Sequence, residues 1–361
     1  MTDLIKLRKE LHSIPEASGK ERKTTEFIVR KLKGFKPDSV MNIRGSVIAV
    51  FKGNSEGKIT AFRCDIDALP VKGSLSHLCG HDGHSAILLG LAEMISERRP
   101  VKGSAVLIFQ SAEETGQGAL KLTKSKEFRA LRIDNIFGFH NIPGYKEGEI
   151  LLKSGPFAMT STGMIISFTG KTSHASEPEK GISPVPAISW LIRYIGKISS
   201  EREKYFGSGT MITVVGMKAG RKNFGISPDK GEIYLTLRSE HDEDMTEAAE
   251  MIEAEARRLS DMSGLTYKIS FKERFPAVIN DAGLTKILRK ITSAQKITML
   301  EKPFPWSEDF GHYARITRAC LFGFGTGKKH PPLHAPEYEF NDNIIKPASD
   351  FLYELYLNSG E

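Results

Sequence analysis

Cys79-Gly80-His81-Asp82-Gly83-His84 is the stretch of this chain richest in metal-ligand and proton-carrying side chains. Its two glycines permit positive φ angles, so we expect a tight loop that gathers these side chains. Cysteine and histidine are preferred ligands of zinc and similar cations, and the Cys-x-His spacing lets both reach one small ion. The alternative is a glycine turn that happens to carry polar residues, but the density of ligands argues against it. The stretch therefore predicts a metal site.

The composition is that of a globular protein, since 40% of the 361 residues are hydrophobic and 26% are charged. The length fits one large domain or two ordinary ones. The net charge of +7 is spread along the chain without a dense basic run. This pattern indicates a solvated lysine-rich surface rather than nucleic-acid binding, and it would suit small anionic substrates.

Neither a membrane span nor a signal peptide is visible in the sequence. No apolar run approaches the roughly 18 residues that cross a bilayer, and residues 1–6 lack a basic region followed by an apolar one. The three cysteines, Cys64, Cys79 and Cys320, are too few and too widely spaced for a disulfide framework. We therefore expect a cytoplasmic protein in which Cys64 and Cys320 are buried packing residues.

Helices and strands alternate in the first part of the chain. Helices are expected over residues 3–13, 20–32 and 85–98, and strands over residues 46–51, 59–64, 101–110 and 133–139. The continuous apolar run within 101–110 is typical of a strand buried on both faces. This alternation predicts an α/β fold, with a mixed, largely parallel sheet and helices on its faces.

Ligand-type side chains follow three of these strands. Asp65 and Asp67 come after the second strand, Glu113 and Glu114 after the third, and His140 after the fourth. Ligands bind at the carboxyl ends of strands in α/β sheets. An isolated Glu-Glu pair is usually an exposed acidic turn. After a buried strand, however, one carboxylate could hold a metal while its neighbour carries a proton from water.

Three histidines are not assigned by their local pattern. His140 alone is more typical of a loop histidine than of a ligand, and His334, flanked by prolines, fits either role. His174 lies in a later segment, and its spacing does not place it in the site.

The pattern changes after residue 156. The expected elements are a strand at 162–170, a helix at 184–198, strands at 209–217 and 233–238, a helix at 244–259 and a strand at 266–271. This β-α-β-β-α-β order is that of a ferredoxin-like module. The chain then returns to a helix (281–293), a strand (319–323) and a closing helix (346–357). We therefore expect a discontinuous metal-binding domain, residues 1–157 and 276–361, with an α+β lid or dimerisation domain inserted at 158–275.

Eight short motifs occur in order along nearly the whole chain. They are Leu11-His12-Ser13-Ile14-Pro15-Glu16, Arg63-Cys64-Asp65-Ile66-Asp67-Ala68-Leu69-Pro70, Cys79-Gly80-His81-Asp82-Gly83-His84, Phe109-Gln110-Ser111-Ala112-Glu113-Glu114, Gly138-Phe139-His140-Asn141-Ile142-Pro143, Gly170-Lys171-Thr172-Ser173-His174-Ala175, Ser307-Glu308-Asp309-Phe310 and Leu333-His334-Ala335-Pro336. In these motifs the chain resembles the M20 metallopeptidase family. The resemblance is to its amidohydrolase branch, which includes aminoacylase-like enzymes, hippurate hydrolases, auxin-conjugate hydrolases and N-acetyldiaminopimelate deacetylases.

The resemblance implies a catalytic centre with two divalent metal ions. The positions that match its five ligands are Cys79, His81, Glu114, His140 and His334. A cysteine at the position of Cys79 separates this branch from relatives that use a bridging aspartate. Zinc or manganese is the expected metal, with cobalt and nickel as alternatives.

The resemblance also implies roles around the metals. Glu113 matches the general base, and Asp67 matches the carboxylate that orients the site. His174 matches a lid histidine that, in related dimers, reaches the partner's active site and would donate a hydrogen bond to the oxyanion. Arg238 and Asn223 match lid residues that hold the substrate's carboxylate. A homodimer through the inserted domain is the implied assembly.

Two stretches depart from the family's pattern. Between Pro70 and Cys79 the family has a longer segment with an acidic residue, whereas this chain has only residues 71–78, so one wall of the cleft should differ. The stretch Asn223–Pro228 is two residues longer than the family's Asn-Val-Ile-Pro, which puts the assignment of Asn223 in doubt. Neither change removes a metal ligand. His84 and His12 are expected to support the structure rather than bind metal.

Three functions follow from these observations. The first is a metal-dependent amidohydrolase that cleaves the amide bond of N-acyl amino acids with a metal-bridged water activated by Glu113. The second is a dipeptidase or carboxypeptidase of the same family, with the same chemistry and a different leaving group. The third is a non-catalytic metal-binding scaffold, and the presence of Glu113 argues against it.

Overall fold

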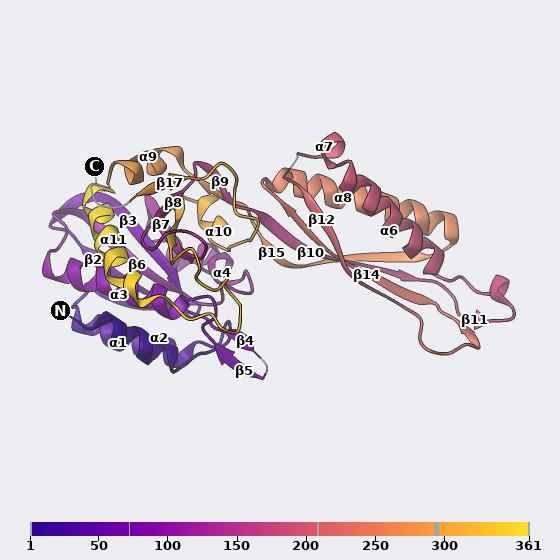
Figure 1. The fold of residues 1–361 in the computed structure, drawn as a ribbon, viewed down its shortest axis with the longest axis horizontal. Helices are drawn as coiled ribbons and strands as arrows, with labels where there is room; N and C mark the ends of the chain where they lie inside the picture. Colours follow the sequence, from indigo (N-terminus) through magenta and orange to yellow (C-terminus); the bar gives the residue numbers. More distant parts are fainter. Residues whose placement is uncertain (1, 72, 208, 292–295, 360–361) are drawn as a thin grey trace. The chain divides into compact units, whose positions relative to one another are not determined.

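The computed structural model describes residues 2–71, 73–207, 209–291 and 296–359, and these fall into two units (Figure 1). The first unit comprises Met1–Phe157, Val278–Pro303 and Glu308–Glu361, and the second comprises Ala158–Ala277 and Phe304–Ser307. Two sequence expectations extend beyond the described residues. Lys72 of the short 71–78 segment and the last two residues of the helix expected at 281–293 lie outside them.

An eight-stranded mixed sheet forms the centre of the first unit, in the order β1-β2-β6-β3-β7-β18-β8-β17. The strands are β1 (Ser39–Ile43), β2 (Ser46–Lys52), β3 (Ser55–Asp65), β6 (Lys102–Gln110), β7 (Asn135–Ile142), β8 (Ile150–Leu152), β17 (Ile297–Met299) and β18 (Arg318–Gly325). The neighbours β6, β3, β7 and β18 run parallel, as do β8 and β17. The pairs β1–β2, β2–β6 and β18–β8 are antiparallel. The mixed α/β fold is therefore confirmed, with the main parallel block at the centre of the sheet.

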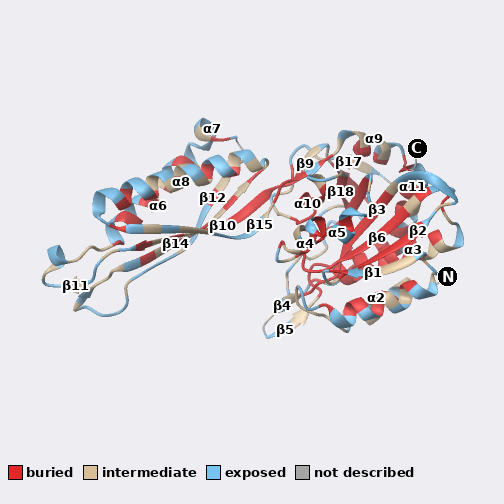
Figure 2. Cartoon of the chain, turned by 180° about the vertical axis from the view of Figure 1, so that it is seen from behind, coloured by how far each residue is buried: buried red, intermediate tan, exposed pale blue. Residues whose placement is uncertain are grey.

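Helices bury the faces of this sheet. The helices of the first unit are α1 (Leu4–His12), α2 (Arg22–Gly34), α3 (His81–Glu97), α4 (Gly118–Lys124), α5 (Lys126–Arg129), α9 (Ala282–Lys290), α10 (Gly311–Ala314) and α11 (Ile345–Ser359). Helix α3 packs on β3, and α1 and α11 pack on α3. Figure 2 shows β3 and β6 as buried strands, whereas α2 alternates between buried and exposed residues. Cys64 and Cys320 are fully buried free thiols in this core, as expected.

The motif at 79–84 differs from the loop that we expected. Helix α3 begins at His81 rather than at Ser85, so His81 and His84 lie in its first turn. Gly80 takes a φ of 86°, which stops the helix from extending toward Cys79. Gly83 is helical, and it is needed for a different reason, because the ring of Phe340 lies against its Cα. The sequence does not reveal this contact, since Phe340 is distant along the chain.

Gly83→Ala is therefore expected to destabilise the protein. A methyl group at this position would overlap the buried ring of Phe340, and overpacking of this kind costs about 1–3 kcal/mol. Gly34→Ala is the matched control, because the position is helical in α2 and a Cβ there would meet nothing within 4 Å. Urea denaturation should show a lower midpoint for the first variant only. Equal midpoints for the two variants would contradict the close contact.

The second unit is built on a four-stranded antiparallel sheet in the order β12-β14-β10-β15. Its elements are β10 (Thr160–Thr169), β11 (Ser173–His174), η1 (Pro178–Lys180), α6 (Val185–Ser200), α7 (Arg202–Tyr205), β12 (Met211–Ala219), β13 (Ile226–Ser227), β14 (Lys230–Ser239), α8 (Asp242–Ser263) and β15 (Thr266–Phe275). The four strands of this sheet and the helices α6 and α8 follow one another along the chain as β10-α6-β12-β14-α8-β15, which is the β-α-β-β-α-β order. Helices α6 and α8 pack on the sheet around an apolar core of their own.

A short segment distant in sequence also belongs to the second unit. The backbone N–H of Met159 donates to the carbonyl oxygens of Phe304 and Trp306, both at 3.1 Å. These contacts attach residues 304–307 to the start of β10, which the sequence did not indicate. The remaining short elements are β4 (Leu69–Val71), β5 (Ser74–Ser76), β9 (Gly155–Ala158), β16 (Val278–Asn280) and η2 (Asp342–Ile344). Among the described residues, no helix has the length and apolarity that crossing a membrane requires.

Candidate metal centre

Side chains from separate segments of the first unit meet beyond the ends of β3 and β6. In one group the ligand atoms of Cys79, Glu114 and His334 lie within 4.8 Å of one another, and in a second those of His81, Glu113 and Glu114 do. Glu114 belongs to both groups, so the ligand atoms form one continuous site. The structure thus brings together residues that the sequence motifs place far apart.

Cys79 and His140 form another contact of this site, with 3.5 Å between Sγ and Nε2. His140 Nδ1 donates to the carbonyl oxygen of Asn141 at 2.9 Å, so the lone pair of the ring is on Nε2. Burial, and then the nearby His84, lower the pKa of His140 to about 3. His140 is therefore a neutral imidazole whose Nε2 is directed at Cys79, as metal binding requires.

Asp67 orients two of the candidate ligands. His81 Nδ1 lies 2.9 Å from the carbonyl oxygen of Asp67 and 3.2 Å from Asp67 Oδ1, which leaves Nε2 to face the site. Asp67 Oδ2 accepts hydrogen bonds from the Glu114 backbone N–H at 3.0 Å and from Ser18 Oγ at 2.6 Å. The Asp67 carboxylate thus fixes the tautomer of His81 and the backbone position of Glu114. Carboxylates beside metal ligands commonly orient the ligands in this way.

Two buried atoms of the site have no hydrogen-bond partner among the described residues, His81 Nε2 and Glu114 Oε1. They lie 3.8 Å apart, and Glu114 Oε1 is also 3.7 Å from His334 Nε2. A buried polar atom without a partner is costly, so such atoms in a folded protein require an explanation. Imidazole nitrogens and carboxylate oxygens at this separation are donors suited to a shared cation. The residues therefore fit a divalent metal ion.

His334 reaches this site through an unusual backbone conformation. Its φ is 67°, in the left-handed region that few residues other than glycine adopt. Its backbone N–H donates to the carbonyl oxygen of Leu78 at 2.9 Å, which fixes the late loop beside Cys79. Local strain of this kind persists where the surrounding structure enforces it, often at functional sites.

Glu113 and Glu114 lie on a tight turn after β6, where Ala112 has a φ of 56°. The two carboxylates lie close together but have different further neighbours, because Glu113 also has ligand atoms near those of Asp65 and Glu308, whereas Glu114 also lies near Cys79 and His334. Glu113 is only 6% exposed, and burial, followed by the charge of Glu308, raises the pKa of its carboxyl group well above the usual range. A carboxylate with a raised pKa is a stronger proton acceptor.

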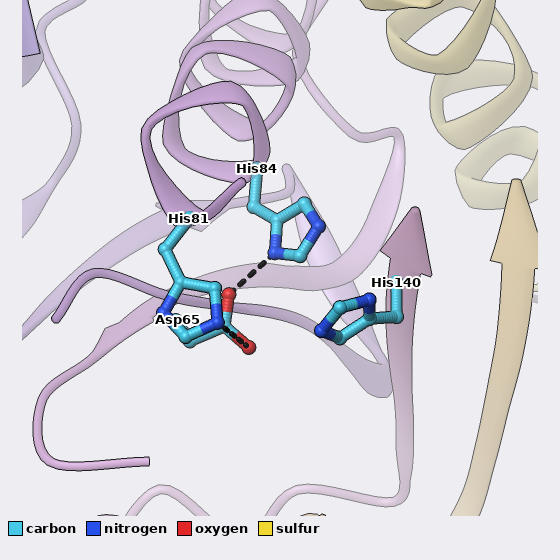
Figure 3. Close-up of side chains that lie close together, drawn as sticks. All are labelled: Asp65, His81, His84 and His140. Carbon is cyan, nitrogen blue, oxygen red and sulfur yellow. Dashed lines mark hydrogen bonds and ion pairs between the residues drawn. The ribbon is translucent and has the colours of Figure 1, made fainter. Parts of the chain in front are cut away.

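Asp65 is at the middle of this arrangement, although it was predicted only as one of the ligand-type residues that follow a strand. Its Oδ1 lies 2.5 Å from His84 Nδ1, and its Oδ2 lies 3.7 Å from His81 Nε2. Figure 3 shows the rings of His81 and His84, from α3, and of His140, from β7, directed toward this carboxylate. The position of Asp65 at the end of a buried strand marked it as a ligand-type residue, but no local pattern revealed its contacts with the two histidines. His84 uses both ring nitrogens in contacts with protein atoms, in keeping with the supporting role that we expected.

A fully buried arginine neutralises part of the negative charge around the site. Arg63 contacts Asp65 Oδ2 at 3.0 Å, Glu308 Oε1 at 2.9 Å and Asp309 Oδ1 at 2.9 Å. Its Nε donates to Gln110 Oε1 at 2.9 Å. Sequence reasoning included Arg63 and Glu308 in motifs without giving them a role, because the ion pairs join segments that are remote along the chain.

The second unit carries the other three candidate site residues. His174 is exposed, and its Nδ1 accepts from the Ser176 backbone N–H at 3.2 Å and contacts Ser176 Oγ at 2.6 Å. Arg238 Nη1 donates to the carbonyl oxygen of Pro305 at 2.9 Å and to Ser307 Oγ at 3.0 Å. In the part of the chain that the structure describes, Arg238 has no carboxylate partner. Asn223 is exposed as well.

Asn223 closes its own turn, since its Oδ1 accepts from the Gly225 N–H at 3.1 Å. The carbonyl oxygen of Gly225 in turn accepts from the Ala175 N–H at 3.0 Å, and His174 pairs with Ile226. The stretch that is longer than the family's pattern therefore lies beside His174 within the second unit.

Metal binding is expected to release protons. Burial and the charge of Glu114 raise the pKa of the Cys79 thiol, and burial raises the pKa of Glu114 to about 7. Burial opposes the charging of His81, but Asp65 and Asp67 outweigh it and raise its pKa to about 10. Near neutral pH these groups hold protons that a metal must displace, so affinity should fall as the pH drops through about 7. Calorimetric titration of stripped protein with zinc in two buffers of different ionisation enthalpy measures this release. Binding heats that are the same in both buffers would contradict it.

Comparison with known proteins identifies the family. The model of peptidase family M20/M25/M40 matches residues 61–358. The chain belongs to this family. The resemblance seen in the motifs is thus confirmed, and the protein is an M20 hydrolase that acts on amide bonds.

Three relatives illustrate how far this M20 chain resembles known members. It is 31% identical to the N-acetyl-L-cysteine deacetylase of Bacillus subtilis, over 97% of this chain and 86% of the relative. It is 28% identical to the hippurate hydrolase of Campylobacter jejuni, over 98% of this chain and 95% of the relative. The crystal structure of a Bacillus subtilis protein described as a dinuclear metal-binding peptidase of the M20 family matches with a TM-score of 0.83 and 26% identity. The match covers 99% of this chain and 98% of that chain.

Proposed function

We propose that this M20 hydrolase is a metal-dependent amidohydrolase that cleaves the amide bond of N-acyl amino acids. The observation that carries the proposal is the convergence of Cys79, His81, Glu114 and His334 beside the buried Glu113. Two of the relatives are named for an N-acetylated amino acid and for hippurate, which supports this substrate class.

Two divalent ions per chain would be held by Cys79, His81, Glu114, His140 and His334. The relative described as binding a dinuclear metal supports this number. One thiolate among imidazoles and carboxylates suits zinc, and manganese, cobalt and nickel also fit such donors. When bound, the ions would lower the pKa of a water molecule and polarise the acyl carbonyl group.

The charge of the site supports two cations. Buried carboxylates around it are Asp65, Asp67, Glu113, Glu308 and Asp309. Arg63 contacts three of these, and Glu114 and the Cys79 thiol add to the negative charge when they are deprotonated. Uncompensated buried charge is strongly unfavourable, so cations would stabilise the site.

Glu113 would move the proton in this reaction. Its carboxylate takes a proton from the attacking water and then gives it to the nitrogen of the leaving amine. Burial raises the pKa of Glu113, which makes its carboxylate a stronger base for the proton of the water. The products are a free amino acid and a carboxylate.

Residues of the second unit would bind the substrate. His174 Nδ1 accepts from the Ser176 N–H, so its Nε2 carries the proton and can donate a hydrogen bond to the oxyanion. Arg238 is partly buried, and this burial lowers the pKa of its guanidinium group. Among the described residues it has no carboxylate partner. This supports a role in binding the substrate's carboxylate. Asn223 would assist through its Nδ2, since its Oδ1 is used in its own turn.

A homodimer through the second unit is part of the proposal. Strand β12 is at an edge of the four-stranded sheet, and it exposes Val215 and Met217 by 60% and 67%. An edge with exposed apolar side chains is a surface on which a second copy could pair. If His174 acts on the partner's active site, mixing His174→Ala and Glu113→Gln subunits should recover some activity. No recovery after verified subunit exchange would contradict action across the dimer.

Amino-acid release from a panel of N-acyl amino acids and dipeptides tests the function. The protein is stripped with a chelator and reloaded separately with zinc, manganese, cobalt or nickel. Metal-restored cleavage of acyl amino acids would support the proposal. Preference for dipeptides would favour a dipeptidase or carboxypeptidase, the alternative supported by the relative described as a peptidase. Metal binding without any cleavage would favour a non-catalytic scaffold.

A further inference from the structure

Asp65 has contacts that suit it to hold the metal centre in place rather than to bind a metal itself. Both carboxylate oxygens already have close partners, because Oδ1 lies 2.5 Å from His84 Nδ1 and Oδ2 lies 3.0 Å from Arg63 Nη1. The carboxylate is fully buried, and Oδ2 is 3.7 Å from His81 Nε2. Asp65 thus contacts one supporting histidine and faces one candidate ligand.

Hydrogen bonds that continue from His84 reach two further segments of the site. The Asn141 backbone N–H donates to His84 Nε2 at 3.2 Å, and Asn141 Oδ1 contacts the same nitrogen. Asn141 Nδ2 then donates to Tyr338 Oη at 2.5 Å. Asn141 follows His140 directly, and its carbonyl oxygen fixes the His140 ring. Tyr338 lies in the same loop as His334, where its backbone N–H donates to the carbonyl oxygen of Ala335 at 3.0 Å.

Arg63 holds the other end of this network. Its guanidinium also contacts Glu308 and Asp309, so it is fixed on several sides. Asp65 is therefore a rigid link between a buried charge network and the residues that adjoin His140 and His334. Networks of fully buried, satisfied polar groups specify one geometry.

We propose that Asp65 is a positioning residue of the metal centre, which through His84 and Asn141 holds His140 and the first turn of α3 where the metal ligands are needed. The proposal rests on the two-metal function proposed above. Partners that orient metal ligands in this way typically change metal affinity by 10- to 100-fold when they are removed.

Asp65→Asn tests the proposal with a side chain of the same shape. Stripped protein is titrated with zinc, and the dissociation constants and the number of bound ions are measured by calorimetry. We expect two ions per chain in both proteins, with dissociation constants about 10- to 100-fold higher in the variant. Excess zinc should then restore most of the activity. The thermal stability of the metal-free forms is recorded alongside.

Asp309→Asn is the matched control. Asp309 is also fully buried and also contacts Arg63 at 2.9 Å, but its other partners are Gln110 and the Ala119 N–H rather than a histidine. This variant should lose stability while its zinc affinity stays within about 3-fold of the parent. An equal loss of affinity in both variants would overturn the proposal, because it would reflect the charge network in general.

His84→Ala provides a second route if Asp65→Asn does not fold, since it leaves the Asp65–Arg63 pair intact. It should weaken zinc binding to a similar extent, and the double variant should be no weaker than either single one, because both residues act in one chain of contacts. Unchanged zinc affinity in these variants would overturn the proposal, as would the loss of one ion per chain in Asp65→Asn, which would make Asp65 a ligand. If the parent protein itself binds no ion, the proposed function fails instead.

Discussion

Glu113→Gln is expected to lower kcat by about 10²- to 10⁴-fold, the usual contribution of a general acid–base residue. Glutamine has the same shape but cannot accept the proton of the attacking water. Glu113 is not among the five proposed metal ligands, so the variant should bind two ions with nearly unchanged affinity. Metal content by mass spectrometry and kcat with an N-acetyl amino acid measure the two effects separately.

The control for this variant is Glu127→Gln, an exposed glutamate in α5. It makes the same chemical change on the same unit, at a residue that belongs to none of the candidate ligand groups. Activity of the Glu113 variant close to that of this control would rule out Glu113 as the base. Loss of metal together with activity would instead assign Glu113 to the ligands.

Arg63→Met is expected to destabilise the metal-free protein by about 3–5 kcal/mol, because removing one partner leaves buried charges uncompensated. The guanidinium is fully buried and contacts Asp65, Glu308 and Asp309. Methionine fills a similar volume but cannot balance these carboxylates. The midpoint of urea denaturation, measured on stripped protein, gives the change in the free energy of unfolding.

Arg318→Met is the comparison for the arginine variant. Arg318 pairs with Asp281 at 3.0 Å but is 47% exposed, so this ion pair should contribute less than about 1 kcal/mol. Arg63→Lys should fall between the two, since an ammonium group keeps the charge but not the fork of donors. Equal denaturation midpoints for the Arg63 and Arg318 methionine variants would show that the buried carboxylates do not need the guanidinium.

Local patterns were sufficient to predict a mixed α/β fold with a largely parallel central sheet. The apolar run of β6 and the alternation of helices and strands indicated the central sheet, because a strand that is buried on both faces has a continuous run of apolar residues. The start of α3 was predicted four residues too late. Gly83 suggested a loop, whereas the real reason for a glycine is the ring of Phe340, a contact that no local pattern records.

The candidate ligands could be predicted only from the series of family motifs, because nothing in the local sequence shows that these residues lie close together in space. His334 alone fitted either a ligand or a loop residue, and it became a candidate by its place in a series of motifs. Asp65 was predicted only as a ligand-type residue after a strand, and Glu308 only as part of a motif, because their shared contact with Arg63 joins segments that lie far apart along the chain. Likewise, residues 304–307 belong to the second unit through hydrogen bonds of Met159 that no periodicity reveals.

Titrating the stripped protein with zinc or manganese, while bound metal and hydrolysis of an N-acetyl amino acid are followed together, tests the central claim most directly. We predict no cleavage without metal and a rise in activity that is complete at two ions per chain. Full activity of the metal-free protein would contradict the account. So would a protein that holds two ions, retains Glu113 and cleaves no amide of any N-acyl amino acid or dipeptide.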